Sequence, residues 1–474
     1  MHRLTTLAAL LLALPIAGSA ATVSFSSTSY PTSSFGPDGV VSADVNRDGR
    51  PDMIIADAQG SPVGVSVFLA TTPGHFGAER TYSITTATNP DSPLAADLNG
   101  DGSLDLILRD WHVAQLHILW NNGDGTFRTG PDVAIGNPAT SFDLGDFNHD
   151  GKLDLAATEC GSTCFLNVYL GHNNGTFTRS QSVQLAGGAG AMHAADVNGD
   201  GMVDLVISRT TQVLVWWGKG NGTFASPTHL TPNGTDGVVE LTLGDFNNDG
   251  RLDIVADGGT LGPNCFSTTG TWSYKNMGGT NFSLAWSSSN FGFAGLRRID
   301  MNGDLNQDLI FMNGDEFCGF YFGLLGNGNG TFQTTAQSVP HPDEAADTYV
   351  RDLDLDSRDD YISDDGLGGT LVALQTGGFK NCAPPSSTKL AAKICVPAAG
   401  STANSPVLVR ASGNSPAGVI QLQVWIDGVK KAVRWHDQLA NKFSLGSGSH
   451  RITVIATDRY TQATASTSTN VTVP

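Results

Sequence analysis

Short apolar runs separated by turns rich in glycine and asparagine recur along most of the chain. Typical runs are MIIAD at Met53, VSVFLA from Val65 and LVISR at Leu205, and they contain many β-branched side chains. Runs of this length that are bounded by Gly and Asn are typical of β-strands. The pattern therefore predicts an all-β protein built from short strands.

A nine-residue motif, D-x-N-x-D-G-x-x-D, repeats between these runs. Five close copies and two looser ones are present, and they begin at Asp44, Asp97, Asp146, Asp196, Asp245, Asp300 and Asp352. A second marker, an NGxGTF-like turn ending in phenylalanine, follows the same repeat, and its frame runs from Phe25 to Phe379. Four short strands in a unit of about 50 residues are typical of a β-propeller blade.

The phenylalanine frame begins in the middle of a unit, which indicates how the repeats close. We expect the strand after Phe25 to complete the blade whose other strands end near Phe379. Closure into a ring removes the exposed sheet edges of an open array. The sequence thus predicts a seven-bladed β-propeller over residues 21–382, followed by a smaller β-sandwich.

The repeated motif has the donor set of a calcium loop. Side-chain oxygens stand at positions 1, 3, 5 and 9, a backbone carbonyl is available at position 7, and glycine at position 6 allows a sharp turn. Hard oxygen donors at this density suit Ca²⁺, whereas an EF-hand is excluded because position 12 is apolar, as at Ile55. The alternative is that these loops are Asx-turns that need no metal.

We therefore predict five to seven Ca²⁺ ions, one per repeat loop. The range reflects the sixth and seventh copies, which depart from the motif because Leu305 and Ser357 replace the glycine at position 6. The candidate ligands, with position 7 acting through its carbonyl, are Asp44, Asn46, Asp48, Arg50, Asp52, Asp97, Asn99, Asp101, Ser103, Asp105, Asp146, Asn148, Asp150, Lys152, Asp154, Asp196, Asn198, Asp200, Met202, Asp204, Asp245, Asn247, Asp249, Arg251, Asp253, Asp300, Asn302, Asp304, Asp308, Asp352, Asp354, Asp356 and Asp360.

These two markers together resemble the FG-GAP/VCBS repeats, the blades that are also found in the propeller of the integrin α-chain. The resemblance covers about residues 22–382, and it implies a seven-bladed propeller with Ca²⁺ in its blade loops. The FG-GAP tag itself is degenerate in this chain and survives in segments such as LGDFN at Leu144 and Leu243.

The first twenty residues have the pattern of an export signal. Arg3 precedes an apolar run from Leu7 to Ile16, and small residues precede a cleavage site after Ala20. No later stretch has the ~18 uninterrupted apolar residues that a membrane-spanning helix needs. The sequence thus predicts a secreted protein with no transmembrane segment, and its location would be extracellular, at the cell surface or periplasmic.

Six cysteines fit an oxidising compartment. Proximity along the chain favours the pairs Cys160–Cys164 and Cys382–Cys395. That choice leaves Cys265 and Cys318, which stand at similar points of neighbouring repeats. Six cysteines allow fifteen pairings, so this choice rests on proximity alone. The alternative is that the cysteines are buried free thiols.

After a Pro/Ser linker at residues 383–392, alternating strands over 393–474 predict an Ig-like β-sandwich with a hairpin turn at Asp427-Gly428. The run from Gly446 resembles the closing strands of bacterial Ig-like modules. Residues 383–474 carry a net charge of +6, whereas residues 21–382 carry −26, with 23 of their 42 acids in the seven motifs. Such acidity argues against a nucleic-acid partner.

Three functions fit these features. The first is a calcium-binding module that recognises a protein or glycan ligand in adhesion. The second is a polysaccharide lyase or glycoside hydrolase, and the third is a structural spacer at a cell surface. The sequence favours the first, because it contains no GxSxG, HExxH or P-loop motif and assigns no catalytic residue. Tryptophans that could either line a sugar-binding face or pack in the core are Trp111, Trp120, Trp216, Trp217, Trp272 and Trp286.

Overall fold

The computed structural model describes residues 23–33, 37–58, 63–232, 237–258, 270–289, 295–313, 320–341, 347–364, 369–377, 382–385 and 387–474. The predicted signal segment at residues 1–20, Cys265, Cys318 and Phe379 lie outside these ranges. All regular secondary structure in the described ranges is β-strand. No helix long and apolar enough to cross a membrane occurs among them.

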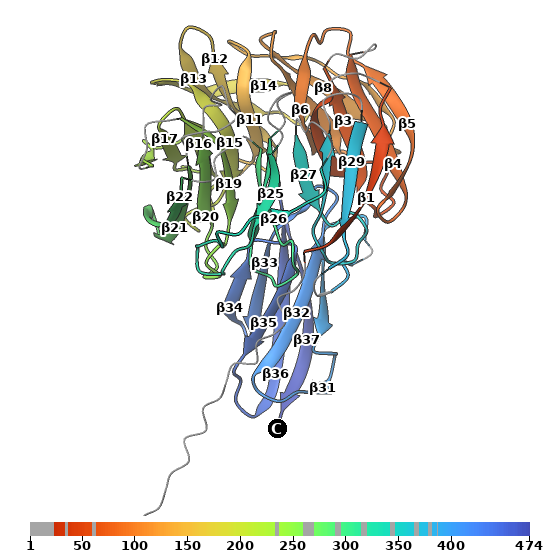
Figure 1. Ribbon diagram of the computed structural model, residues 1–474, viewed down its shortest axis with the longest axis vertical. Coiled ribbons are helices and arrows are strands. Elements are labelled where there is room, and N and C mark those ends of the chain that lie inside the picture. The colour runs from red at the N-terminus through yellow and green to blue at the C-terminus, as the bar shows by residue number, and fades with distance from the viewer. Residues whose placement is uncertain are drawn as a thin grey trace, which may run out of the picture.

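Seven antiparallel sheets are arranged as a ring of blades (Figure 1). The first strand of each blade is innermost. Blade 1 contains β2 (Pro37–Ala43), β3 (Asp52–Asp57), β4 (Gly64–Thr72) and β5 (His75–Ser83), and blade 2 contains β6 (Pro90–Ala96), β7 (Asp105–Asp110), β8 (Gln115–Asn121), β9 (Phe127–Thr129) and β10 (Val133–Ala134). Blade 3 contains β11 (Ala139–Gly145), β12 (Asp154–Cys160), β13 (Cys164–Gly171) and β14 (Phe177–Leu185).

Blades 4 to 7 repeat this order. Blade 4 contains β15 (Ala189–Ala195), β16 (Asp204–Arg209), β17 (Gln212–Trp216) and β18 (Thr228–Leu230), and blade 5 contains β19 (Val238–Gly244), β20 (Asp253–Gly258), β21 (Thr271–Gly278) and β22 (Asn281–Ser288). Blade 6 contains β23 (Leu296–Ile299), β24 (Asp308–Asn313), β25 (Phe320–Leu324) and β26 (Gln337–Ser338). Blade 7 contains β27 (Thr348–Arg351), β28 (Asp360–Asp364) and β29 (Gly369–Gln375) and is completed by β1 (Phe25–Pro31).

The ring closes as the sequence predicted. Strand β1 pairs antiparallel with β29, so that Phe25 lies opposite Gln375 and Pro31 lies opposite Gly369. The innermost strand β2 contacts both β6 of the next blade and β27 of the last blade. The N-terminal strand therefore joins the two ends of the repeat array, and the seven-bladed propeller is confirmed.

The NGxGTF-like turns connect neighbouring blades. The backbone amide of Gly222 in blade 4 donates to the Phe147 carbonyl in blade 3 at 2.8 Å, and Gly330 in blade 6 donates to Phe246 in blade 5 at 2.9 Å. Gly222 has a φ of +75°, and a Cβ there would lie 2.6 Å from a methyl group of Leu170. Glycine is needed at this point because the turn packs directly on the preceding blade.

The C-terminal region forms a sandwich of two sheets, with strand orders β30-β32-β35 and β31-β37-β36-β33-β34. Its core contains Val409, Leu422 and Val454, and its Ig-like identity stays a prediction. The strands are β30 (Ala391–Val396), β31 (Ser401–Thr402), β32 (Val407–Asn414), β33 (Val419–Ile426), β34 (Val429–Arg434), β35 (Gln438–Phe443), β36 (Gly448–Asp458) and β37 (Thr464–Val473).

The predicted hairpin and two of the predicted disulfides are present. Asp427 and Gly428 both have positive φ, as a two-residue turn between β33 and β34 requires. Cys160 bonds to Cys164 at the end of a blade 3 hairpin, and Cys382 bonds to Cys395 where the sandwich begins. Covalent links therefore lie both within a blade and at the domain junction.

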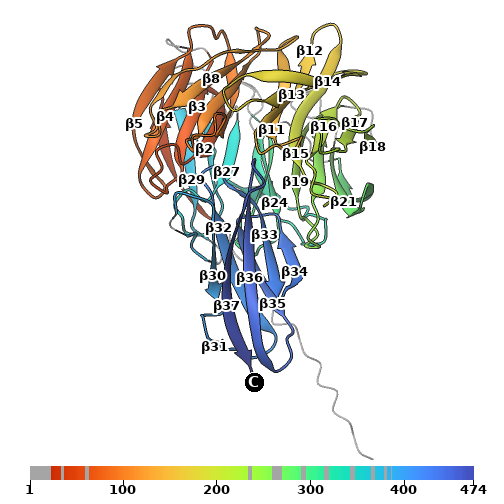
Figure 2. The same cartoon turned by 180° about the vertical axis from the view of Figure 1, so that it is seen from behind.

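The sandwich stands on one face of the propeller (Figures 1 and 2). Its three turns at 415–418, 435–437 and 459–463 reach the ring, where Trp435 and Tyr460 are buried in clusters formed by blade residues. We call this end of the ring the loop face, because each nine-residue motif joins an innermost strand to the second strand there. The other end is the far face.

Candidate metal centres

All seven motifs fold into the same loop, and blade 4 shows its hydrogen bonds. The two carboxylate oxygens of Asp196 accept the backbone amides of Asp200 at 3.1 Å and Gly201 at 2.9 Å. The Asn198 side chain also accepts from Asp200 at 2.8 Å, and the Asp200 carboxylate accepts from Met202 at 2.8 Å. These bonds fold side chains 1, 3 and 5 of the motif back over one short loop.

The equivalent bonds recur in the other six blades. Loops 6 and 7 share this geometry although they lack the glycine. Leu305 and Ser357 adopt φ values of +70° and +77° at position 6, the region that glycine occupies in the other copies. A non-glycine residue in this conformation costs about 1 kcal/mol. The motif oxygens evidently hold the loop in shape even where the residue at position 6 opposes it.

The aspartate at position 9 joins the second strand of its blade to the segment that follows the first strand and to the end of the third strand or the segment just after it. In blade 4, Asp204 accepts the amide of Val197 at 3.0 Å and the amide of Gly218 at 2.8 Å, one on each oxygen. Burial raises the pKa of Asp204 to about 7, although both amides act in the opposite direction. The same two-oxygen arrangement occurs at Asp52, Asp105, Asp154, Asp253, Asp308 and Asp360.

In several loops the side chain at position 7 carries a positive charge, a contribution that was not predicted from the sequence. Arg50 pairs with Asp48 at 2.5 Å, Lys152 with Asp150 at 3.0 Å and Arg251 with Asp249 at 2.5 Å. These cations sit beside the carboxylate at position 5 and offset part of its charge. All are partly exposed to solvent, so each pair adds little stability by itself.

The loops differ in how far the first aspartate is buried. Asp97, Asp146 and Asp196 in blades 2 to 4 are partly exposed. The equivalent residues in the remaining blades are buried, and they are Asp44, Asp245, Asp300 and Asp352. The first aspartate is buried in this second group because the sandwich packs against these loops.

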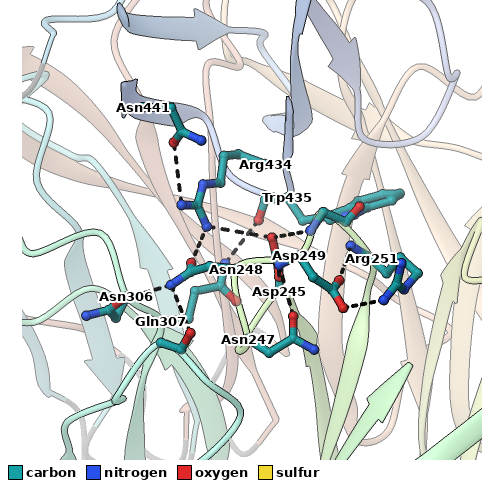
Figure 3. Close-up of polar contacts among 12 residues, drawn as sticks. Asp245, Asn247, Asn248, Asp249, Arg251, Asn306, Gln307, Arg434, Trp435 and Asn441 are labelled. Carbon is teal, nitrogen blue, oxygen red and sulfur yellow. Dashed lines mark hydrogen bonds and ion pairs between the residues drawn. The ribbon is translucent and has the colours of Figure 1, made fainter. Parts of the chain in front are cut away.

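The closest contact is with the blade 5 loop (Figure 3). Arg434 of the sandwich lies 3.6 Å from a carboxylate oxygen of Asp245 and also hydrogen-bonds the Asn248 side chain. Trp435 donates its indole N–H to the Gly250 carbonyl at 3.1 Å. The Trp435 carbonyl in turn accepts from Gln307 of the blade 6 loop at 3.2 Å.

A second contact involves the blade 7 loop. The imidazole of His436 lies 3.1 Å from Asp359 and 2.9 Å from Asp437. Burial opposes a charge on this ring, but the two carboxylates hold the pKa of His436 well above its usual range. Asp359 also accepts the amide of Asp300 at 2.8 Å. Sequence reasoning missed Arg434 and His436, and the only signal was the basic charge of the C-terminal region.

The donor chemistry of the loops fits a calcium ion. In blade 7, carboxylate oxygens of Asp352, Asp354 and Asp356 lie within 4.8 Å of one another. Donors 1, 3 and 5 are all oxygens, which suit Ca²⁺ rather than a transition metal. At position 9 both carboxylate oxygens accept hydrogen bonds from backbone amides. This aspartate therefore has a structural role in addition to its predicted role as a calcium ligand.

Most of the candidate tryptophans pack inside the protein. Trp286 is partly buried against Phe332, whereas Trp111 is 41% exposed. Trp111 lies in the turn between β7 and β8, on the far face. The four fully packed side chains are Trp120, Trp216, Trp217 and Trp272.

Comparison with known proteins identifies the repeat. A family model for the FG-GAP-like repeat matches residues 44–108, 109–157, 160–207 and 196–256. A T-cell immunomodulatory protein homolog from Plasmodium falciparum (isolate 3D7) is 28% identical over an alignment of 141 residues that covers 26% of this chain. The match spans 20% of that relative's own length.

Three solved structures align with parts of this chain. An Agrocybe aegerita lectin that recognises non-reducing terminal N-acetylglucosamine aligns with 64% of this chain and 80% of its own, at 20% identity and a TM-score of 0.44. A functionally unknown protein from Desulfotomaculum acetoxidans DSM 771 covers 64% and 78%, at 11% identity and a TM-score of 0.40.

The third is the Photorhabdus luminescens Tc holotoxin pore, which covers 86% of this chain and 19% of its own at 14% identity and a TM-score of 0.33. The chain therefore matches the FG-GAP-like repeat across residues 44–256 and is similar over a short stretch to the T-cell immunomodulatory protein homolog.

Proposed function

We propose that this protein is an exported, calcium-loaded β-propeller that binds a protein or glycan ligand through its far face. The observation that carries the proposal is the position of the sandwich. Its turns occupy the centre of the loop face, where Arg459 reaches into the ring and donates to the Tyr349 hydroxyl at 3.3 Å. A ligand that approaches along the ring axis from that side meets the sandwich, so the far face is the accessible one.

Calcium would be held by the oxygens at positions 1, 3 and 5 of each loop and by the carbonyl at position 7. Bound Ca²⁺ supplies positive charge to loops that gather 23 carboxylates. Position 9 fixes the loop to the neighbouring strands through two backbone amides. The protein thus uses its acidic residues for structure on one face and leaves the other for recognition.

Export is part of the proposal. The predicted signal at residues 1–20 and the two disulfides agree with an oxidising compartment outside the cytoplasm. We propose a secreted or surface-associated protein, with the periplasm as a further location. Propellers concentrate recognition in the loops at the ends of their strands, but the fold alone fixes no ligand.

The test is a binding screen with the intact secreted protein on a glycan array and on an array of extracellular proteins, in calcium and in chelator. We expect saturable binding to at least one class of ligand in calcium, and weaker binding in chelator. A protein that is folded and calcium-loaded but binds neither array would contradict the proposed function and favour a spacer. Release of reducing ends or unsaturated uronates would instead indicate an enzyme.

A further inference from the structure

A buried ion pair fixes the far end of blade 2. Asp91 in β6 and Arg109 in β7 face each other across the sheet, and the guanidinium makes two hydrogen bonds to the carboxylate, of 2.5 and 2.7 Å. The side chains are only 5% and 11% exposed, respectively. Two parallel bonds of this kind set the orientation of the arginine as well as its position.

This pair holds the exposed Trp111. The guanidinium carbon of Arg109 lies 4.0 Å from the centre of a Trp111 ring. Burial raises the pKa of the Asp91 carboxylate, although Arg109 and Trp111 act in the opposite direction. The indole is therefore supported on one face by a fixed cation, and its 41% exposure presents a rigid apolar surface to solvent.

A second polar group lies at the same end of the ring. Arg297 of β23 donates to Asp347 at 2.8 Å and lies 3.5 Å from Glu240 of β19. These three side chains are 19–30% exposed, so they can still contact a ligand. They belong to blades 5, 6 and 7, at the far ends of the innermost strands or directly before them.

The two groups influence each other electrostatically. The Asp347 carboxylate contributes to the raised pKa of Asp91, which burial mainly causes. Burial also raises the pKa of Glu240, and Arg109 acts against that effect. The two groups are also connected through blade 1 at the mouth of the ring. The Val40 amide of β2 donates to the Asp347 carboxylate at 3.2 Å, and the neighbouring Gly39 packs on the backbone of Ser92, the residue after Asp91. We call these six residues the mouth cluster: Asp91, Arg109, Trp111, Glu240, Arg297 and Asp347.

We propose that the mouth cluster is a recognition site for a neutral sugar residue of a glycan, a proposal that rests on the proposed function. A supported indole offers a flat apolar surface for the C–H face of a pyranose ring. The partly exposed carboxylates and guanidinium supply acceptors and donors for hydroxyl groups, the combination of apolar wall and few fixed polar groups that small-ligand sites use.

The charge of the cluster selects against acidic sugars. Asp91, Glu240 and Asp347 outnumber the two arginines by one, so the mouth cluster itself carries a net negative charge. A uronic or sialic acid would approach a negative surface and would lose affinity through repulsion. The site therefore fits an uncharged hexose or N-acetylhexosamine.

The experiment uses the intact protein on a printed array of neutral, amino and uronic oligosaccharides, followed by titration of the neutral oligosaccharide that scores highest. We expect Trp111→Ala to weaken that binding by at least tenfold and Trp111→Phe to retain most of it. The matched control is Trp425→Ala, because Trp425 is a partly buried sandwich tryptophan that also lies beside a cation, Lys430 at 5.8 Å. That variant should bind as the wild type does.

A second variant tests the selectivity for neutral sugars. Glu240→Gln removes one negative charge from the mouth cluster, and we expect it to raise the affinity for uronic oligosaccharides relative to neutral ones. Thermal melting of each variant separates a loss of binding from a loss of folding. An unchanged ratio in a folded Glu240→Gln protein would contradict the selectivity for neutral sugars.

Two outcomes overturn the site without overturning the proposed function. Glycan binding that persists unchanged in Trp111→Ala would place the ligand elsewhere on the propeller. An intact protein that binds purified extracellular proteins but no glycan would show that the ligand is not a sugar. Binding to neither array would contradict the proposed function itself.

Discussion

The loops of blades 2 to 4 and those of blades 5 to 7 share one backbone but have different surroundings. In both groups the aspartate at position 1 accepts the same two backbone amides, as in blades 4 and 5. In the first group the leading aspartate is partly exposed, whereas in the second it is buried under or beside the sandwich. The motif alone therefore sets the shape of a loop, and the docked domain changes how its charge is balanced.

This comparison explains the uneven charge of the chain. The sandwich carries +6 and the propeller −26. Arg434 and His436 bring positive charge to blades 5 and 7, where buried carboxylates need a partner. Buried charges are costly unless they are paired. The basic C-terminal region thus complements the acidic face on which it stands.

Removal of calcium should have the largest effect. An ion that binds only the folded state stabilises by about 4 kcal/mol when its concentration is a thousandfold above Kd. We therefore expect EDTA to lower the melting temperature strongly. Hydrogen exchange should rise more in the loops of blades 2 to 4, because Arg434 and His436 remain beside the loops of blades 5 and 7. An equal rise in both groups would contradict the comparison, and an unchanged melting temperature would contradict calcium binding.

Loss of Trp435 should act mainly on the covered loops. Its side chain is buried between the sandwich and blades 4 and 5, and truncation of a buried tryptophan costs about 3–5 kcal/mol. We expect Trp435→Ala to speed hydrogen exchange around Gly250 in blade 5 but not around Gly151 in blade 3. Trp425→Ala serves as the control on the same domain. Equal exchange at both loops would show that the sandwich does not support blade 5.

The aspartate at position 9 should matter equally in both groups. Each of Asp204 and Asp253 is buried and accepts amides from two segments, so alanine would leave buried donors without partners. We expect Asp204→Ala and Asp253→Ala each to lower the free energy of unfolding by about 2–4 kcal/mol. Urea unfolding measures this loss. Asp124→Ala, an exposed turn variant, is the control and should change little, and a similar result for Asp204→Ala would refute the structural role.

The pH dependence should be the smallest effect and should appear only without calcium. Burial raises the pKa of Asp204 and Asp253 to about 7, above the ordinary value near 4. The folded state thus holds protons that the unfolded state releases, and the stability they contribute is present below pH 4 and is lost as the pH rises through 7. In EDTA, the melting temperature should fall between pH 5 and pH 8. A rise over that interval would contradict the assignment.

Much of the fold could be predicted because the same sequence pattern recurs in each of the seven blades. The motif, the NGxGTF-like turn and the offset of Phe25 together gave the blades and the pairing of β1 with β29. The position of the sandwich could not be predicted in this way. Contacts such as Arg434 with Asp245 join residues far apart in sequence and occur once, so no local pattern reveals them.

The candidate sites show the same limit. The spacing of the motif indicated which oxygens would come together, but it did not show that both oxygens of Asp204 are engaged by the backbone. It also did not single out Trp111 from five other tryptophans, because exposure depends on the packing of neighbouring strands. Exposure, rather than residue type, distinguished Trp111 from the tryptophans of the core.

The most direct test of the account is to count the calcium ions on the intact protein. The protein would be purified in calcium, passed through a metal-free column and examined by native mass spectrometry and by elemental analysis. The account predicts five to seven tightly bound Ca²⁺ ions, with those of blades 2 to 4 released first by chelator. A folded protein that retains no calcium would contradict it.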